Sequence, residues 1–348
     1  MVGASKDEAG ERDDTMPEQN TGARRPATLK DVAREAGVSI AAVSYSLNGG
    51  GTIGDEVRAR VRDVAERMGY RPNRSAQAVR TGRTTTLGLV VPDLNNPYYP
   101  ALAQSFERAA RLAGYTVVLI DTSGSEEEEV HGIHHLENHG AAGAVWCQTA
   151  SQPTGVASDY IMPIVVIGSP DLTFDNVTAD DTAGGQLAAR HLLDLGHRKI
   201  GILGGSSVPE GKDDRRAAFV AELKGKATIG WELTTPYAID LDARVIEQLQ
   251  RREVTAVMCG NDLIAIGVLR AARQLGIRVP EELSVVGFDD IPWASIVTPA
   301  LTTVNQPVAE MAAVALTLLL DRLAEPQRPV RHFKVGVKLI ARDSAAAV

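Results

Sequence analysis

The residues best suited to chemical recognition lie between 40 and 48, in the stretch IAAVSYSLN. Val43 and Leu47 are four residues apart, which predicts one apolar side of a helix. The other side carries small, polar and aromatic groups without net charge: Ile40, Ala41, Ser44, Tyr45 and Asn48. Such groups suit the major groove of DNA, where base edges are distinguished by hydrogen bonds and methyl contacts. We therefore expect this helix to read a DNA sequence.

A second set of candidates lies in three loops that follow Val- and Ile-rich segments, namely PDLNNPYYP, GGSSVPEGKDDRR and GNDLIA. Ligands of open parallel sheets bind beyond the carboxyl ends of the strands, where such loops lie. A planar guanidinium and a carboxylate can bind neighbouring hydroxyls, and tyrosine rings can cover an apolar ligand face. We expect these loops to line a cleft between two lobes.

Four histidines, His131, His134, His135 and His139, fall on one expected helix. The pairs His131–His135 and His135–His139 have the i, i+4 spacing that can chelate a metal ion. No cysteine or fixed carboxylate completes a site, although Glu126 to Glu129 lie upstream. A solvated helix surface without a metal is the favoured interpretation.

Catalytic motifs are missing from the sequence. GILGGSS lacks the lysine and spacing of a P-loop and the glycine pattern of a dinucleotide site. No Ser–His–Asp or Cys–His set is supported by spacing. We expect neither an enzyme nor a bound cofactor.

The helix at 40–48 must be positioned by its neighbours in the chain. Thr28 can cap a first helix and Asp31 can cap in return, while Gly37 permits the positive φ at which that helix ends. A third helix is expected over 55–68. Three small helices with one shared core predict a compact headpiece of about 45 residues, which is near the lower limit for independent folding.

From residue 86 the pattern changes to short apolar segments that alternate with helical ones. The expected buried strands are LGLVV, TVVLI, GAVWC, IVVI, KIGIL, TAVMC and LSVVGF, and helices are expected at 101–113, 183–195, 262–275 and 308–323. This alternation is typical of parallel, doubly wound α/β domains. The sequence therefore predicts an all-α headpiece followed by an α/β core of two doubly wound parallel-sheet lobes.

Charge is distributed unevenly along the 348 residues. The net charge of −8 argues by itself against a nucleic-acid partner, but residues 24–83 hold twelve Lys and Arg against six Asp and Glu. Residues 1–23 carry −4 and the remainder carries −10. A basic module on an acidic body can be steered towards phosphates.

The composition, 44% hydrophobic and 23% charged, is typical of a soluble globular protein. No run of eighteen apolar residues is present, and the start lacks the apolar region of a secretory signal, so we expect a cytoplasmic protein without membrane contact. Residues 1–26 are expected to be a disordered tail. Cys147 and Cys259 lie in apolar strand-like runs, which favours buried free thiols.

Several ordered motifs resemble the LacI/GalR family of bacterial transcription regulators. They are TLKDVAREAGVS, VRARVRDVAERMGYRPNRSAQ, TLGLVVPDLNNPYY, AARHLLDLGHRKIGILGG, GNDLIAIGVLRAARQLGIRVPEELSVVGFDD and TPALTTVNQP. The resemblance implies a helix-turn-helix headpiece at 27–71, a hinge helix and linker at 72–84, and a periplasmic-binding-protein-like core at 85–348. It places the first lobe at about 85–179 and 293–322, and the second at about 180–292 and 323–342.

The resemblance also implies homodimers, or tetramers, that bind double-stranded palindromic operators, with a small effector controlling DNA affinity. The base-reading positions of the family fall on Ile40, Ala41 and Tyr45. Positions near phosphates or in the hinge fall on Ser39, Ser44, Asn48, Asn73, Arg74, Ala76, Gln77 and Val79, and Thr28 is a further candidate contact. The sequence departs from the usual family pattern at Ala42, Tyr45 and Ser46, and Val79 stands where the family inserts a leucine into the minor groove.

For the ligand, the resemblance points to Tyr98, Tyr99, Arg215 and Asp262, with Asn261 orienting Asp262. Asp262 could equally cap the helix that begins there. The region GWELTTPYAIDLDAR lacks the family's usual glycine–acid–aromatic sequence, and Tyr237 could replace that aromatic residue.

The sequence favours a transcription regulator, and specifically a repressor, over two other classes of function. A solute-binding protein without a DNA role conflicts with the basic headpiece and with the missing signal segment. An enzyme on a Rossmann-like core conflicts with the lack of a catalytic constellation.

Overall fold

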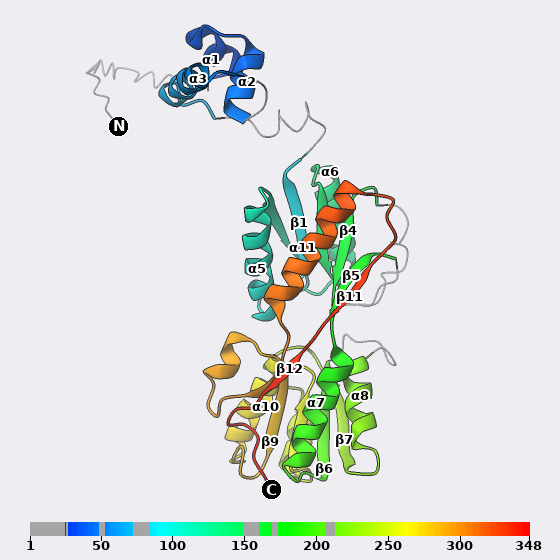
Figure 1. Ribbon diagram of the computed structural model, residues 1–348. Helices are drawn as coiled ribbons and strands as arrows, with labels where there is room; N and C mark the ends of the chain where they lie inside the picture. The colour runs from blue at the N-terminus through cyan, green and yellow to red at the C-terminus, as the bar shows by residue number, and fades with distance from the viewer. Residues whose placement is uncertain are drawn as a thin grey trace, which may run out of the picture. The chain divides into compact units, whose positions relative to one another are not determined.

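The computed structural model describes residues 25, 27–48, 53–71, 84–148, 160–168, 173–205 and 213–348. The chain divides into two compact units, Met1–Thr81 and Gly82–Val348 (Figure 1). The first unit holds three helices in its described part: α1 (Leu29–Ala36), α2 (Ile40–Asn48) and α3 (Asp55–Arg67). They share one apolar core, at whose centre Val32, Val43 and Val61 are fully buried.

Local capping fixes the bounds of α1 and α2. The Thr28 hydroxyl accepts from the backbone N–H of Asp31, and the Asp31 carboxylate accepts from the backbone N–H of Thr28, as the sequence predicts. Gly37 ends α1 at φ 67°, in the left-handed region that favours glycine. The Ser39 hydroxyl accepts from the Ala42 N–H at 3.1 Å and so caps α2.

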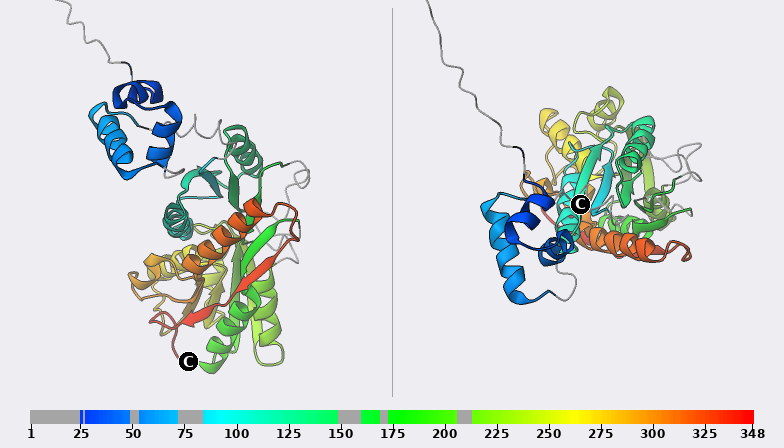
Figure 2. Two further views of the ribbon diagram at one scale, coloured as in Figure 1. Left: turned by 45° about the horizontal axis from the view of Figure 1, so that its top comes forward. Right: turned by 90° about the horizontal axis from the view of Figure 1, so that it is seen from above.

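The first lobe of the second unit is built on a six-stranded parallel sheet in the order β11-β5-β4-β3-β1-β2. Its strands are β1 (Thr86–Val91), β2 (Thr116–Asp121), β3 (Gly143–Cys147), β4 (Ile164–Ile167), β5 (Asp175–Ala179) and β11 (His332–Val335). Helices α5 (Tyr98–Leu112) and α11 (Val308–Ala324) lie side by side on one face, and α6 (Glu126–Asn138) covers the other (Figure 2).

The second lobe repeats this plan with the order β12-β10-β9-β8-β6-β7, in which β12 alone is antiparallel. Its strands are β6 (Lys199–Gly205), β7 (Thr228–Thr235), β8 (Ala256–Cys259), β9 (Ser284–Asp289), β10 (Thr302–Asn305) and β12 (Lys338–Ile340). One face is covered by α7 (Asp181–Asp194) and α8 (Asp214–Leu223), the other by α9 (Ala243–Gln250) and α10 (Asp262–Gln274). A short 3-10 helix, η1 (Pro292–Ser295), follows β9.

The chain passes between the two sheets three times: after β5, between β10 and α11, and between β11 and β12. The expected lobe bounds are therefore wrong for two segments. Strand β10 pairs with β9, so the second lobe extends to Asn305 rather than ending at 292. Strand β11 pairs with β5, so the first lobe extends to Val335 rather than ending at 322. Both strands are four residues long and carry polar or charged side chains, so their composition does not distinguish them from loops.

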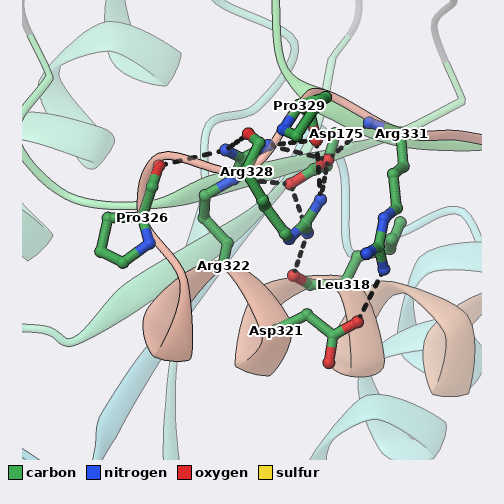
Figure 3. Close-up of polar contacts among 8 residues, drawn as sticks. All are labelled: Asp175, Leu318, Asp321, Arg322, Pro326, Arg328, Pro329 and Arg331. Atoms are coloured by element: carbon green, nitrogen blue, oxygen red, sulfur yellow. Dashed lines mark hydrogen bonds and ion pairs between the residues drawn. The ribbon is translucent and has the colours of Figure 1, made fainter.

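A buried ionic cluster joins the elements that lead to these crossings (Figure 3). Asp175, at the start of β5, is only 1% exposed. Its carboxylate accepts from Arg322 at 3.0 and 3.1 Å and from Arg328 at 2.8 and 2.9 Å, and it also accepts from the Arg331 N–H at 2.8 Å. Burial would raise the pKa of Asp175, but these hydrogen bonds outweigh it and lower the pKa. The cluster therefore fastens the end of α11 and the start of β11 to β5.

His197 ties the C-terminal segment to the second lobe. It is 2% exposed; its Nδ1 lies 2.8 Å from the Thr255 hydroxyl and its Nε2 lies 3.2 Å from the Ala346 carbonyl. The carbonyl can only accept, so this network assigns the proton to Nε2 of a neutral ring. Burial lowers the pKa of His197 below its usual value.

We expect His197 to make stability sensitive to pH. Its folded pKa lies below its unfolded pKa, so stability falls as pH drops through about 6.5 towards the folded value. Asp289 has a raised pKa, so it changes stability with pH in the opposite direction. The contribution of His197 must therefore be measured by comparing a His197 variant with the unchanged protein. Thermal melts at pH 7.5 and 5.5 should show a smaller acid-induced loss of stability for His197→Gln than for the unchanged protein. Equal losses in the two proteins would rule out this role.

Candidate DNA-reading surface and ligand site

The outer face of α2 is exposed as the sequence predicts. Ile40 is 44% and Tyr45 49% exposed, and Ala41 is also exposed, whereas Val43 is fully buried. Neither end of α2 carries a charged residue. The exposed face therefore presents an aromatic ring, a hydroxyl and methyl groups. Because it carries no charged side chain, covering it with a partner does not require a charge to be removed from water.

Two of the three positions that depart from the family pattern are turned away from this face. Ser46 is fully buried, and its hydroxyl has no hydrogen-bond partner among the residues that the structure describes. Ala42 is half-buried. Of these three departures, only Tyr45 is exposed on this face. The hinge candidates Asn73, Arg74, Ala76, Gln77 and Val79 lie outside the described residues, as does the side chain of Asn48.

In the first lobe, Tyr98 and Tyr99 open helix α5 just beyond the carboxyl end of β1. Their rings make an edge-to-face contact with centroids 5.2 Å apart. Tyr98 is 9% exposed, and its hydroxyl lies 3.5 Å from Gln306 Oε1 and 3.8 Å from the sulfur of Met311. Burial raises the pKa of both tyrosines well above the usual value, so both remain neutral donors.

In the second lobe, Arg215 stands on α8 within a close set of partners. Its Nε and Nη2 donate to Asp181 Oδ1 at 3.2 and 2.9 Å, and its Nη1 donates to the Gly260 carbonyl. The guanidinium carbon lies 3.3 Å above the centroid of the Phe288 ring. The sequence predicted Arg215 here but missed Asp181 and Phe288, which come from the start of α7 and from β9.

Asn261 and Asp262 differ from their predicted roles. The Asn261 side chain, not that of Asp262, caps α10 by accepting from the Ile264 N–H at 3.0 Å. Asp262 is fully buried, and its two oxygens accept from the Thr303 hydroxyl at 2.5 Å and the Ile291 N–H at 2.9 Å. It therefore joins α10 to β10 and to the segment before η1. Burial, followed by the charge of Asp289, raises its pKa well above the usual value.

Asp289 and Gln306 are further polar residues at this edge that the sequence did not single out. Asp289 ends β9 with φ 116°, an uncommon conformation for a residue other than glycine. It accepts from Gln306 Nε2 at 2.7 Å. Burial raises its pKa to about 7, against the lowering effect of Arg215. The signal that could have found it is the pair of acids in GFDD, directly after the last strongly apolar strand.

Tyr237 lies against the carboxyl end of β6, since a Cβ added at Gly205 would overlap its ring. Burial raises the pKa of this phenol to about 12. Whether Tyr237 replaces the family's aromatic residue at the ligand stays a prediction. Only a residue as small as glycine at 205 leaves room for the ring.

The histidine-rich helix α6 shows no metal-binding geometry. His131, His134, His135 and His139 are exposed, and the rings of His135 and His139 stack at 4.1 Å. In the described part of the chain, no group of three or more His, Cys, Asp or Glu side chains could hold a metal ion. Within the same residues, no helix is both long and apolar enough to cross a membrane.

Two family models match the chain. Residues 28–73 match the bacterial regulatory proteins of the lacI family, and residues 189–345 match a periplasmic binding protein-like domain. The ribose operon repressor of Haemophilus influenzae is 30% identical over 326 residues, which cover 91% of this chain and 98% of the relative. The repressor PurR of Serratia proteamaculans is 31% identical and covers 92% and 97%, and the regulator DegA of Bacillus subtilis is 35% identical and covers 82% and 88%.

Solved structures agree with these matches. The lac repressor dimer bound to operator and the anti-inducer ONPF superposes with a TM-score of 0.82 at 25% identity, over 93% of this chain and all of that chain. A LacI family regulator from Enterococcus faecium with bound ribose gives a TM-score of 0.68 at 26% identity, over 76% and 99%. The near-complete coverage of repressors that are about 30% identical shows that this chain belongs to the LacI family of bacterial transcription regulators.

Proposed function

We propose that this protein is a repressor that binds a palindromic operator as a homodimer and changes its affinity when a small molecule occupies the cleft. The observation that carries the proposal is the exposed, uncharged face of α2, held by a capped and packed three-helix unit. Paired recognition helices in successive major grooves would impose two-fold symmetry on the operator. DNA as the partner implies action in the cytoplasm, and no catalytic activity is proposed.

The proposed DNA contacts divide into two classes. Ile40, Ala41 and Tyr45 touch base edges, because they form the exposed tip and side of α2. Contacts to phosphates or to the minor groove are proposed for Thr28, Ser39, Ser44, Asn48, Asn73, Arg74, Ala76, Gln77 and Val79. Phosphate contacts supply affinity and register, and base contacts supply sequence preference.

For the cleft, we propose that Tyr98, Tyr99 and Arg215 face the ligand together with Asp289 and Tyr237. Asn261 and Asp262 then act behind the site, because both are buried and already engaged in holding α10. Gln306 lies on the second crossing of the chain, between β10 and α11. Its side-chain amide donates a hydrogen bond to Asp289 of the second lobe, and its Oε1 lies near the Tyr98 hydroxyl of the first lobe. A ligand at Asp289 would therefore act on the crossing that sets the arrangement of the lobes.

The homodimer is supported by exposed apolar groups on the second unit. Strand β2 is an edge strand that exposes Val118 and Leu119, and Leu112 at the end of α5 is 80% exposed. Trp293 and Ile296 are exposed on the second lobe. Unprotected apolar edges are usually covered, and pairing with a second copy across a two-fold axis would cover them.

Selection of bound fragments from genomic DNA, followed by gel shift, tests the proposal. We expect the selected fragments to share a palindromic site. The logarithm of the binding constant should fall linearly with the logarithm of the salt concentration, because protein contacts to phosphates release bound counterions. Effectors suggested by the neighbouring genes should then shift operator affinity. Binding of such a ligand without any sequence-selective DNA binding would instead support a solute-binding protein.

A further inference from the structure

Among the residues that the structure describes, the positive charge of the ligand site belongs to Arg215, which is already paired with a carboxylate of the second lobe. The Arg215 side chain is 17% exposed, and three of its five N–H groups donate to Asp181 or to the Gly260 carbonyl. One face of the guanidinium is covered by Phe288. Burial alone would disfavour the charged form, but the charges of Asp181 and Asp289 raise the pKa of Arg215. Arg215 is therefore a permanent cation whose counterion belongs to the protein.

The helices that carry Arg215 and Asp181 are closely packed, so the two side chains have little room to move apart. A Cβ at Gly185 would overlap the carbonyl oxygen of Arg215, and a Cβ at Gly184 would meet the Phe288 ring at 2.6 Å. The two glycines thus let α7 approach α8 and β9 closely. Helix α7 also carries Asp181 in its first turn. The close packing of α7 against α8 therefore holds Asp181 beside Arg215.

A second carboxyl group, that of Asp289, also acts on Arg215 and raises its pKa. Asp289 is 7% exposed, and burial raises its own pKa to about 7. In the same lobe, Arg342 donates to Asp290 at 2.6 Å and to the Leu301 carbonyl at 2.8 Å. Arg215 and Arg342 are therefore each paired with a carboxylate of the protein.

We propose that Asp181 determines the class of ligand that the cleft accepts: by neutralising Arg215, it reserves the site for uncharged, hydroxyl-bearing molecules and excludes phosphate esters and other anions. This inference rests on the proposed function of the cleft. An anion would have to displace Asp181 from Arg215, and the ionised fraction of Asp289 would repel it. A neutral hydroxyl can donate to Asp289 and accept from the remaining N–H groups of Arg215 without separating any ion pair.

The test uses the full-length protein and inorganic phosphate as the probe, against chloride at equal ionic strength. Thermal melts and titration calorimetry compare the unchanged protein with Arg215→Met, with Asp181→Asn, with Asp181→Asn/Arg215→Met, and with Asp194→Asn. The last variant makes the same change on an exposed residue of α7. Asp181→Ser serves as a second release variant if Asp181→Asn does not fold.

We expect no saturable phosphate effect in the unchanged protein or in Asp194→Asn. Releasing Arg215 by Asp181→Asn should give saturable binding, seen as a rise in melting temperature of about 2 °C or more, and the double variant should lose it. Among pairs such as D-ribose and D-ribose 5-phosphate, the unchanged protein should bind the neutral member at least roughly tenfold more tightly wherever either binds.

Two results would overturn the inference. One is saturable phosphate binding by the unchanged protein that Arg215→Met abolishes, because Arg215 would then be an open anion receptor. The other is the absence of any gain in both Asp181 variants, because something other than Asp181 would then block Arg215. Gel shifts on the same samples separate this from the proposed function: lost operator binding with the expected phosphate pattern would refute the repressor and leave the charge assignment intact.

Discussion

Asp175→Asn is expected to lower the free energy of unfolding by about 3–5 kcal/mol, the cost of leaving a buried charge without its partner. Arg328 has a side chain only 3% exposed, and Arg322 is 15% exposed. Both would keep their charges after the substitution while losing the carboxylate that compensates them. Because the same carboxylate also accepts from the Arg331 N–H, the start of β11 would lose an anchor as well.

Asp321→Asn provides the matched control for this variant. Its carboxylate pairs with Arg331 at 2.9 Å in the same region, but the two side chains are 46% and 48% exposed (Figure 3). Surface pairs of this kind contribute about 0–1 kcal/mol. Urea unfolding should show a shifted midpoint for Asp175→Asn and little change for Asp321→Asn. Equal effects would mean that the buried cluster is no stronger than a surface ion pair.

Exchange of Ile40, Ala41 and Tyr45 together is expected to change the preferred operator while leaving binding to random DNA nearly intact. A good base contact discriminates by about 1–3 kcal/mol, so Tyr45→Ala alone should weaken binding to the selected operator roughly tenfold or more. Binding to random DNA depends on phosphates and should change little. Competition gel shifts measure both affinities in one experiment.

Circular dichroism of the same variants shows whether α2 remains folded. The three side chains lie on the exposed face, away from the core around Val43, so their removal should not disturb packing. If selection with the triple variant returned the original operator, base reading by this face would be refuted. A parallel loss on operator and random DNA would assign Tyr45 to phosphate contact instead.

The headpiece could be predicted from the sequence because its determinants are local. The reciprocal caps of Thr28 and Asp31 are three residues apart, and Gly37 acts at its own position. The buried side of α2 follows from helical periodicity alone, since Val43 and Leu47 are one turn apart. No distant partner was needed to place any of these residues.

The second unit was predicted less completely, because its polar residues find partners far along the chain. Asp175 looks like a loop acid in DNVTA, yet it binds arginines 147 and 153 positions away. Asp262 was expected to face a ligand, and its engagement with Thr303 depends on a strand that its composition does not reveal. Residue types and spacing thus indicated which strand ends carry candidate site residues, whereas the buried contacts of Asp262 depend on the register of the sheets.

The position of β11 and β12 has a consequence for biosynthesis. The first lobe takes its β11 edge strand, and the second lobe its β12 edge strand, from residues 332–340, near the end of the chain. During translation both sheets therefore remain open at that edge until the ribosome has released this segment. A nascent or truncated chain that stops before residue 332 would leave two unfinished lobes rather than one finished and one missing. Such chains expose unpaired strand edges and are expected to need chaperones or to be degraded.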